Sequence, residues 1–201
     1  MVGGDTPVTL VMAFIGKAGA VMAGDMREIT FLGDRVSMER LEEELYSGCI
    51  VSDEDLLKRA GELGVKLGIR DDKVKVSEKG GVLVGEVTSL EGGVLRRRRV
   101  YASAGSYAIL DIGGPAVTMR GRDGPGNFVV LGNEKTKEIA HRCIRERWRN
   151  GSTRDAMEII TRSMETASQS SASVSRHFIL LQTSEKVDLG KLIDAAGRER
   201  I

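Results

Sequence analysis

The strongest restriction on the fold comes from an apolar hairpin pattern close to the N-terminus. Residues 8–15 are apolar apart from Thr9, and a short apolar run bounded by turn residues is typical of a buried strand. Gly16-Lys17-Ala18-Gly19 follows as a hairpin turn. A second strand of small residues covers 20–24 and ends at Asp25. The sequence therefore predicts that residues 8–25 form a buried hairpin.

Two helices are expected after this hairpin and one further short strand at 28–32. Ser37 is the expected cap of the first helix, which carries Leu41 on its apolar side. Ser52 begins a capping-box pattern that starts the second helix, whose apolar positions recur at helical spacing as far as Leu67. Residues 1–7 have the composition of a loose tail.

From Lys73 onward the apolar residues recur with a period of two, which predicts strands. Expected strands cover 82–90, 94–103, 107–112 and 127–131, followed by helices at 134–148 and 152–167, a strand at 178–182 and a terminal helix at 189–196. Strands and helices thus fall into separate blocks, which predicts an α+β fold. Their order fits a four-layer αββα sandwich with two antiparallel sheets between helix pairs.

Charge and composition exclude several classes of protein. The 30 Lys and Arg residues nearly balance 29 Asp and Glu, a net charge of +1, which argues against nucleic acid as a partner. The longest apolar stretch is too short to span a membrane, so membrane insertion is not expected. Two cysteines cannot build a disulfide framework, and a reducing, cytoplasmic compartment is the simplest interpretation.

The run from Thr9 to Asp25 resembles the start of a mature proteasome β subunit. That family begins with a nucleophilic Thr, a strand, a Gly-Lys-x-Gly turn, a second strand and an Asp, and the spacing here matches without a gap. The next residues, 26–31, resemble connectases, the proteasome-related protein ligases of methanogenic archaea. The resemblance is specific over 9–33 and looser over 128–183. It implies an N-terminal nucleophile fold with one proteasome-β-like domain over 9–201.

The resemblance assigns the nucleophile to Thr9. A threonine hydroxyl needs a base, and in this fold the base is the residue's own α-amine, whose pKa of about 7.7–8.0 leaves much of it neutral near pH 7–8. An amide nitrogen has no such basicity. We therefore expect residues 1–8 to be a leader that is removed, or an over-extended start of the reading frame. Val8 stands where proteasome precursors usually have the Gly after which they cut themselves, which favours the second explanation.

Further site residues are also implied by the resemblance. Asp25 matches the family's buried acidic residue, which orients the nucleophile. The family's Lys falls near Leu41, in an expected helix, so Arg27 is the expected substitute. Backbone N–H groups near Gly132 and Asn133 are expected to form an oxyanion hole, with Asn133 in place of a family Ser. The family's Asp-x-x-Ser pair falls in a segment that lacks the Asp, and its candidate residues are Ser171, Ser173 and Ser175.

Other polar groups have structural explanations. Thr9 and Asp25 also suit a strand and a turn. In a strand only two of residues 96–99, all Arg, share a face, so a charged, solvated edge strand explains them better than a patch for an acidic protein substrate.

His141 and Cys143 lie two apart in an expected helix and do not share a face, which argues against a metal site or a Cys/His pair. Residues 132–136 lack the glycines of a phosphate loop.

The expected reaction is transfer of a peptide acyl group. Thr9 would attack a substrate carbonyl and pass the acyl group to an incoming amine. The resemblance implies a protein or peptide substrate with a Lys-Asp-Pro-Gly-Ala-like motif, and a methyltransferase subunit of methanogenesis as the natural partner. No metal or organic cofactor is expected. Two other functions stay open: a threonine hydrolase, in which water takes the acyl group, and a catalytically silent proteasome-like binding or scaffold protein.

Overall fold

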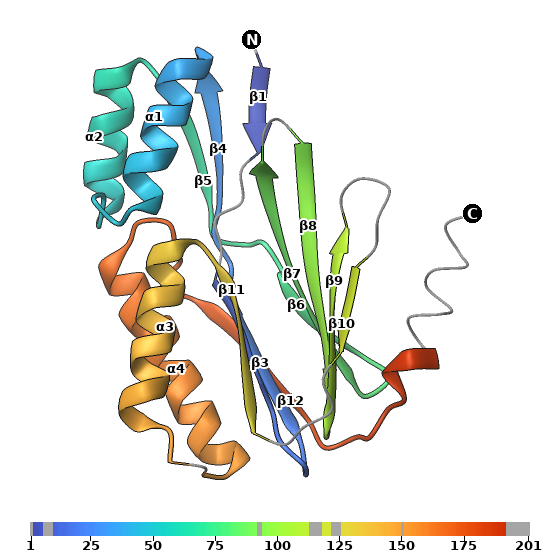
Figure 1. The fold of residues 1–201 in the computed structure, drawn as a ribbon. Helices are drawn as coiled ribbons and strands as arrows, with labels where there is room; N and C mark the ends of the chain where they lie inside the picture. Colours follow the sequence, from blue (N-terminus) through green and yellow to red (C-terminus); the bar gives the residue numbers. More distant parts are fainter. Residues whose placement is uncertain are drawn as a thin grey trace.

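A four-stranded antiparallel sheet forms the centre of the protein (Figure 1). The structure is a computed structural model that describes residues 2–5, 10–91, 94–112, 118–121, 126–149 and 151–191. Strand order in the central sheet is β11 (Asn127–Gly132), β2 (Leu10–Ile15), β3 (Ala20–Asp25) and β12 (Phe178–Thr183). The Gly16 N–H donates to the Gly19 carbonyl, 2.8 Å away, which closes the predicted hairpin turn. Every residue of β2 and β3 is buried, as an apolar hairpin requires.

Helices cover one face of this sheet and a second sheet covers the other. The helices are α3 (Glu134–Arg147) and α4 (Thr153–Ser170), which pack on β2 and β3. The second sheet has the order β10 (Thr118–Gly121), β9 (Ser106–Ile112), β8 (Val94–Ser103), β7 (Val82–Glu91) and β6 (Val76–Lys79). At Gly85 the sheets approach so closely that a Cβ would lie 2.7 Å from the Val11 side chain and 2.8 Å from the Met22 sulfur.

A third sheet, with its own pair of helices, forms a separate unit. Its strands are β1 (Val2–Asp5), β4 (Glu28–Gly33) and β5 (Lys66–Arg70). The helices α1 (Arg35–Tyr46) and α2 (Asp53–Leu63) pack on it around a hydrophobic cluster of their own. We call residues 28–70 the helical lobe. In Figure 1 the lobe lies above the α3–α4 pair, on the same side of the molecule.

The predicted fold class is confirmed: the protein is α+β, with two antiparallel sheets stacked against each other. The position of one helix pair differs from the expectation, because α1 and α2 pack on the third sheet rather than on the outer face of the five-stranded sheet. That outer face instead contacts Leu189, where a C-terminal helical segment begins. Residues 192–196 of the predicted terminal helix lie outside the described residues.

Several element boundaries need correction. The cap of α1 is Asp34, whose carboxylate accepts a hydrogen bond from the Ser37 N–H. Helix α2 ends at Gly64, with φ +70°, so Leu67 belongs to strand β5 and not to a helix. Residues 2–5 are a strand paired with β4 rather than a loose tail. Strand β10 was not predicted.

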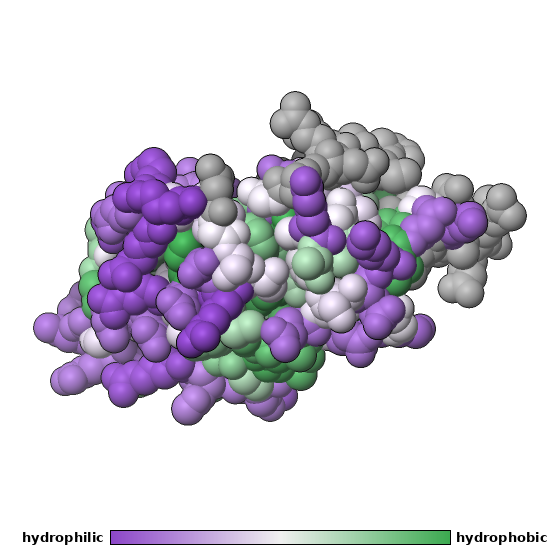
Figure 2. Space-filling model, turned by 90° about the horizontal axis from the view of Figure 1, so that it is seen from below, coloured by the Kyte–Doolittle hydropathy of each residue, from purple (hydrophilic) through white to green (hydrophobic). Residues whose placement is uncertain are grey.

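Among the described residues, the exposed large apolar side chains are Leu32, Val36, Val51, Leu57 and Val74. Seen from below, hydrophilic residues surround a smaller hydrophobic area (Figure 2). Of the two cysteines, Cys49 is exposed and Cys143 is buried. None of the helices in the described part of the chain combines the length and apolar character of a membrane span.

Candidate active site

The ends of the four central strands meet at one edge of the sheet. Gly132, at the end of β11, lies opposite Leu10, at the start of β2. Asp25, at the end of β3, lies opposite Phe178, at the start of β12. Antiparallel register therefore gathers Gly132–Asn133, Asp25 and the segment before Phe178 around the beginning of β2. Thr9 lies outside the described residues, and Leu10 is its described neighbour.

Asp25 is the most enclosed polar group at this edge. Its side chain has no exposed surface. One carboxylate oxygen accepts from the Leu10 N–H and the other from the Arg27 N–H, each at 2.8 Å. The Lys75 ammonium group donates to both oxygens, at 2.9 and 3.0 Å. A buried carboxylate with these donors is satisfied in its ionised form.

Lys75 is the functional candidate that the sequence interpretation missed. Its side chain is 4% exposed, and burial lowers the pKa of its ammonium group, although the negative charge of Asp25 opposes this shift. The Lys75 carbonyl accepts from the Glu86 N–H at 2.9 Å, which fixes this residue to β7. Gly24 leaves room for this segment, since a Cβ there would lie 2.8 Å from the side chain of Val76, the residue after Lys75.

The local sequence pattern around Lys75 was misleading. In the run 73–76 a period of two puts Lys73 and Lys75 on one face, whereas the structure exposes Val74 at 61% and buries both Lys75 and Val76. Leu41, where simple counting puts the family's Lys, is a fully buried residue of α1.

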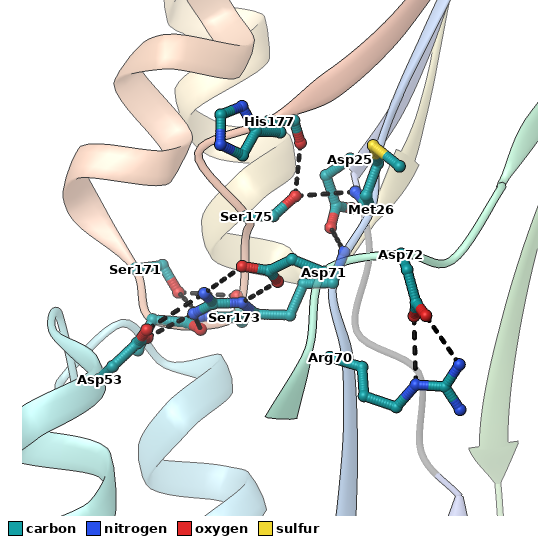
Figure 3. Close-up of polar contacts among 12 residues, drawn as sticks. Asp25, Met26, Asp53, Arg70, Asp71, Asp72, Ser171, Ser173, Ser175 and His177 are labelled. Carbon is teal, nitrogen blue, oxygen red and sulfur yellow. Dashed lines mark hydrogen bonds and ion pairs between the residues drawn. The ribbon is translucent and has the colours of Figure 1, made fainter. Parts of the chain in front are cut away.

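Residues 171–175, which we call the serine-rich segment, lie against the same edge of the sheet. Ser171, Ser173 and Ser175 are all buried, and the Ser175 hydroxyl accepts from the Met26 N–H at 2.8 Å and donates to the His177 carbonyl at 2.5 Å (Figure 3). The hydroxyl oxygens of Ser171 and Ser173 are 2.7 Å apart. The segment is thus packed and hydrogen-bonded, not a flexible linker.

Asn133 has a structural role besides the one implied by the resemblance, and its position directly before a predicted helix is typical of it. It caps α3: its side-chain oxygen accepts from the Thr136 N–H at 2.8 Å. Its amide nitrogen donates to the Ser173 hydroxyl at 3.4 Å. Asn133 therefore joins the end of β11 and the start of α3 to the serine-rich segment.

Arg27 is close to Asp25 through its backbone, but its side chain points elsewhere. The guanidinium group forms ion pairs with Asp53 and Asp71 and donates to the Ala172 carbonyl at 2.7 Å. These carboxylates raise the pKa of Arg27, and Arg27 in turn lowers the pKa of Asp71. Among the described residues, the cation that contacts the Asp25 carboxylate is Lys75.

The remaining polar groups have the surroundings expected of structural residues. The expectation of an edge strand at residues 96–99 is wrong: β8 lies between β7 and β9, and Arg98 pairs with Asp111 and Arg99 with Glu86 across these neighbouring strands. His141 is exposed whereas Cys143 is buried, so the two do not face each other. Within the described ranges, no group of three or more His, Cys, Asp or Glu side chains could hold a metal ion.

Comparison with solved structures finds chains of low sequence identity. Anbu (ancestral beta-subunit) from Yersinia bercovieri is 12% identical, with a TM-score of 0.41 over 88% of this chain and 82% of that one. HslV from Trypanosoma brucei is 16% identical, with a TM-score of 0.38 over 88% and 100%. Anbu from Pseudomonas aeruginosa, solved as a helical assembly, is 13% identical, with a TM-score of 0.39 over 95% and 94%. No curated protein matches the sequence.

Comparison with protein families gives a match that covers most of the sequence. The family described as connectase MJ0548-like, N-terminal domain, matches residues 8–196. The match begins one residue before Thr9 and includes Asp25, Lys75, Asn133 and the serine-rich segment. This chain belongs to the connectase N-terminal domain family.

Proposed function

We propose that the protein is an N-terminal-threonine transpeptidase, a protein ligase that acts through an acyl-enzyme on Thr9. One observation carries the proposal: the buried Asp25–Lys75 pair lies at the head of β2, where the Asp25 carboxylate holds the N–H of Leu10, the residue that follows Thr9. Membership of the connectase family supports the same reaction.

In the proposed mechanism the free α-amine of Thr9 accepts the proton of its own hydroxyl. The Thr9 oxygen attacks the substrate carbonyl, and the carbon–nitrogen bond of the peptide breaks. The departing amine takes the proton from the α-ammonium group, which leaves the acyl group on Thr9 as an ester. An incoming amine then attacks this ester and gives up a proton to the Thr9 α-amine. The carbon–oxygen bond of the ester breaks as the new peptide bond forms, and the α-ammonium group passes this proton to the Thr9 oxygen.

Lys75 and Asp25 would contribute electrostatics rather than bonds. A positive charge near Thr9 favours the ionised hydroxyl and the oxyanion that forms during attack, and Asp25 holds that charge in place. N–H groups near Gly132 and Asn133 are the proposed oxyanion donors, and the serine-rich segment is the proposed wall against the substrate. We propose a cytoplasmic protein or peptide with a Lys-Asp-Pro-Gly-Ala-like motif as the substrate, and a methyltransferase subunit of methanogenesis as the partner that carries it.

The test mixes two peptides that carry this motif and different tags with a chain that begins at Thr9. A product that joins the tags of both peptides supports ligation. Fragments alone support hydrolysis, and no reaction supports a binding or scaffold role. We expect Thr9→Ala to lower the rate by about 10³-fold or more, whereas Thr9→Ser retains part of it.

The leader provides the matching control. A chain shown by intact mass to retain residues 1–8 has an amide instead of an amine at Thr9, so we expect it to be inactive until the leader is removed. Turnover by that chain, or turnover that survives Thr9→Ala, would contradict the mechanism.

A further inference from the structure

Arg27 is a buried cation that joins partly exposed carboxylates next to the candidate site. Its side chain is 6% exposed. Nε and one terminal nitrogen donate to the two oxygens of Asp71 at 2.8 and 2.9 Å, and the terminal nitrogens also bond to Asp53 and to the Ala172 carbonyl. An arginine has five N–H donors, and these five hydrogen bonds use all of them. Arg27 has no donor left for a substrate, so any effect on the reaction must pass through its neighbours.

Each neighbour of Arg27 belongs to a different part of the protein. Asp53 is the first residue of α2, in the helical lobe. Asp71 follows β5 and begins the segment that leads to Lys75. Ala172 lies in the serine-rich segment, where its N–H donates to the Ile50 carbonyl of the lobe at 3.1 Å. Figure 3 shows Asp53, Asp71 and the serines converging from these separate elements.

We propose that Arg27, Asp53 and Asp71 form a latch through which the docked helical lobe positions Lys75 and the serine-rich segment around Asp25. The activity predicted from this latch rests on the proposed function, but its geometry does not. Arg27, Asp53 and Asp71 are positioning residues in this scheme, since they act through Lys75 and Asp25.

The physical reason for such a device is geometric. Ion pairs that take a charge such as that of Arg27 out of water add little to stability, because desolvation offsets their attraction, yet they can select one arrangement over others. Bidentate contacts between arginine and carboxylate fix angles as well as distances. Asp53 also lies at the N-terminus of α2, where the helix dipole favours its negative charge. Release of either carboxylate would leave the lobe and the Lys75 segment free to shift relative to each other.

Lys75 offers a reporter for this coupling. The carboxylates that raise the pKa of Lys75 are Asp25 on β3, Glu28 on β4 and Asp71 in its own segment, and burial opposes them. Loss of the Asp71 charge should therefore lower the Lys75 pKa further. Asp53 is not among the groups that shift this pKa, so a change at Asp53 should reach Lys75 only through movement of the latch.

The experiment compares Asp53→Asn, Asp71→Asn and Arg27→Lys with two matched controls. Glu54→Gln changes the next carboxylate along α2. Asp72→Asn changes the carboxylate next to Asp71, which pairs with the exposed Arg70 and points away from the latch. Lys75 is titrated by NMR of isotopically labelled lysine in the Thr9→Ala chain, with Lys75→Met to assign its signal. In the active chain, kcat and KM for ligation are measured across pH.

We expect the three latch variants to lower kcat by about tenfold or more, because small misplacements of positioned groups are that costly. We expect Asp71→Asn and Asp53→Asn to shift the Lys75 titration and the pH profile, whereas both controls match the parent. Arg27→Lys combined with Asp53→Asn should cost less than the sum of the single changes.

Two results would overturn the latch. One is a Lys75 titration and pH profile that stay unchanged in Asp53→Asn and Arg27→Lys while only thermal stability falls. The other is an equal loss of kcat in the two controls. If Arg27→Lys fails to fold, Asp53→Asn still tests the latch. The Asp53 side chain is 53% exposed, so we expect this variant to fold. If the parent chain joins no peptides but the Lys75 titration shifts as expected, the proposed function fails and the latch stands.

Discussion

At the scale of single residues, the ion pair between Asp25 and Lys75 dominates the candidate site. Both side chains are almost fully buried, at 0% and 4% exposure. An isolated charge at such a depth would be very unfavourable, so each residue depends on the other. This dependence makes the pair testable without any substrate.

We predict that Lys75→Met lowers the free energy of unfolding by about 3–5 kcal/mol, because it leaves the Asp25 carboxylate buried without its cation. Urea unfolding measures the change. The matched control is Lys73→Met, whose ammonium group pairs with Glu28 but is 53% exposed, and it should cost less than about 1 kcal/mol. The double variant Asp25→Asn with Lys75→Met should lose less than the two single variants together. If Lys73→Met and Lys75→Met lower the free energy of unfolding equally, the buried Asp25–Lys75 pair contributes no more to stability than an exposed ion pair.

The sequence predicted some residues of the site better than others. Asp25 ends the hairpin whose spacing matches the family without a gap. Its position at the end of β3 could therefore be predicted from local spacing. Lys75 is brought to Asp25 from 50 residues further along the chain by the insertion of the helical lobe, and no local pattern encodes that distance. The side-chain partners of Arg27, Asp53 and Asp71, also come from the lobe and its exit, so local spacing could not predict them either.

At the scale of secondary-structure elements, the close approach of β3 to the start of β6 positions Lys75. Gly24 permits this approach. We predict that Gly24→Ala costs about 1–3 kcal/mol and lowers activity, since its Cβ would lie 2.8 Å from the Val76 side chain and displace the residue next to Lys75. Gly61→Ala in α2 is the control: a Cβ there meets no atom within 4 Å, so it should stabilise the helix slightly. If Gly24→Ala changes neither the free energy of unfolding nor the rate of ligation, this account is wrong.

Element boundaries show where local sequence rules were sufficient. Ser52 caps α2 as its capping-box pattern predicts, and Ser152 caps α4. The expected cap of α1 was Ser37, but Asp34, three residues earlier and directly after β4, caps the helix and accepts the Ser37 N–H. Leu67 fits the apolar spacing of α2, but Gly64 ends the helix three residues earlier in a left-handed conformation. The spacing of apolar residues alone does not indicate where the helix ends.

At the scale of the whole molecule, the protein has separate hydrophobic clusters. One lies between the central sheet and α3–α4, one between the two large sheets, and one inside the helical lobe. The order of strand and helix blocks predicted the stacked sheets. It could not predict which sheet α1 and α2 would cover, since both possible faces are apolar and the choice depends on long-range packing.

We predict that the helical lobe opens without global unfolding. Native-state hydrogen exchange should show amides of α1 and α2 exchanging about tenfold or more faster than those of β2 and β3 through a sub-global opening. Asp53→Asn should speed exchange in the lobe and leave β2 unchanged. Equal protection across lobe and central sheet would mean that the clusters unfold as a single unit.

The unequal exposure of the two thiols has a practical consequence. Cys49 is exposed just after α1, whereas Cys143 is a buried residue of α3 that packs into the core between this helix and the central sheet. A maleimide dye should therefore attach to the native chain at one position only. Because that position lies in the lobe, close to Ile50 and its contact with Ala172, the dye's emission would report lobe movement during peptide binding with no engineered attachment point.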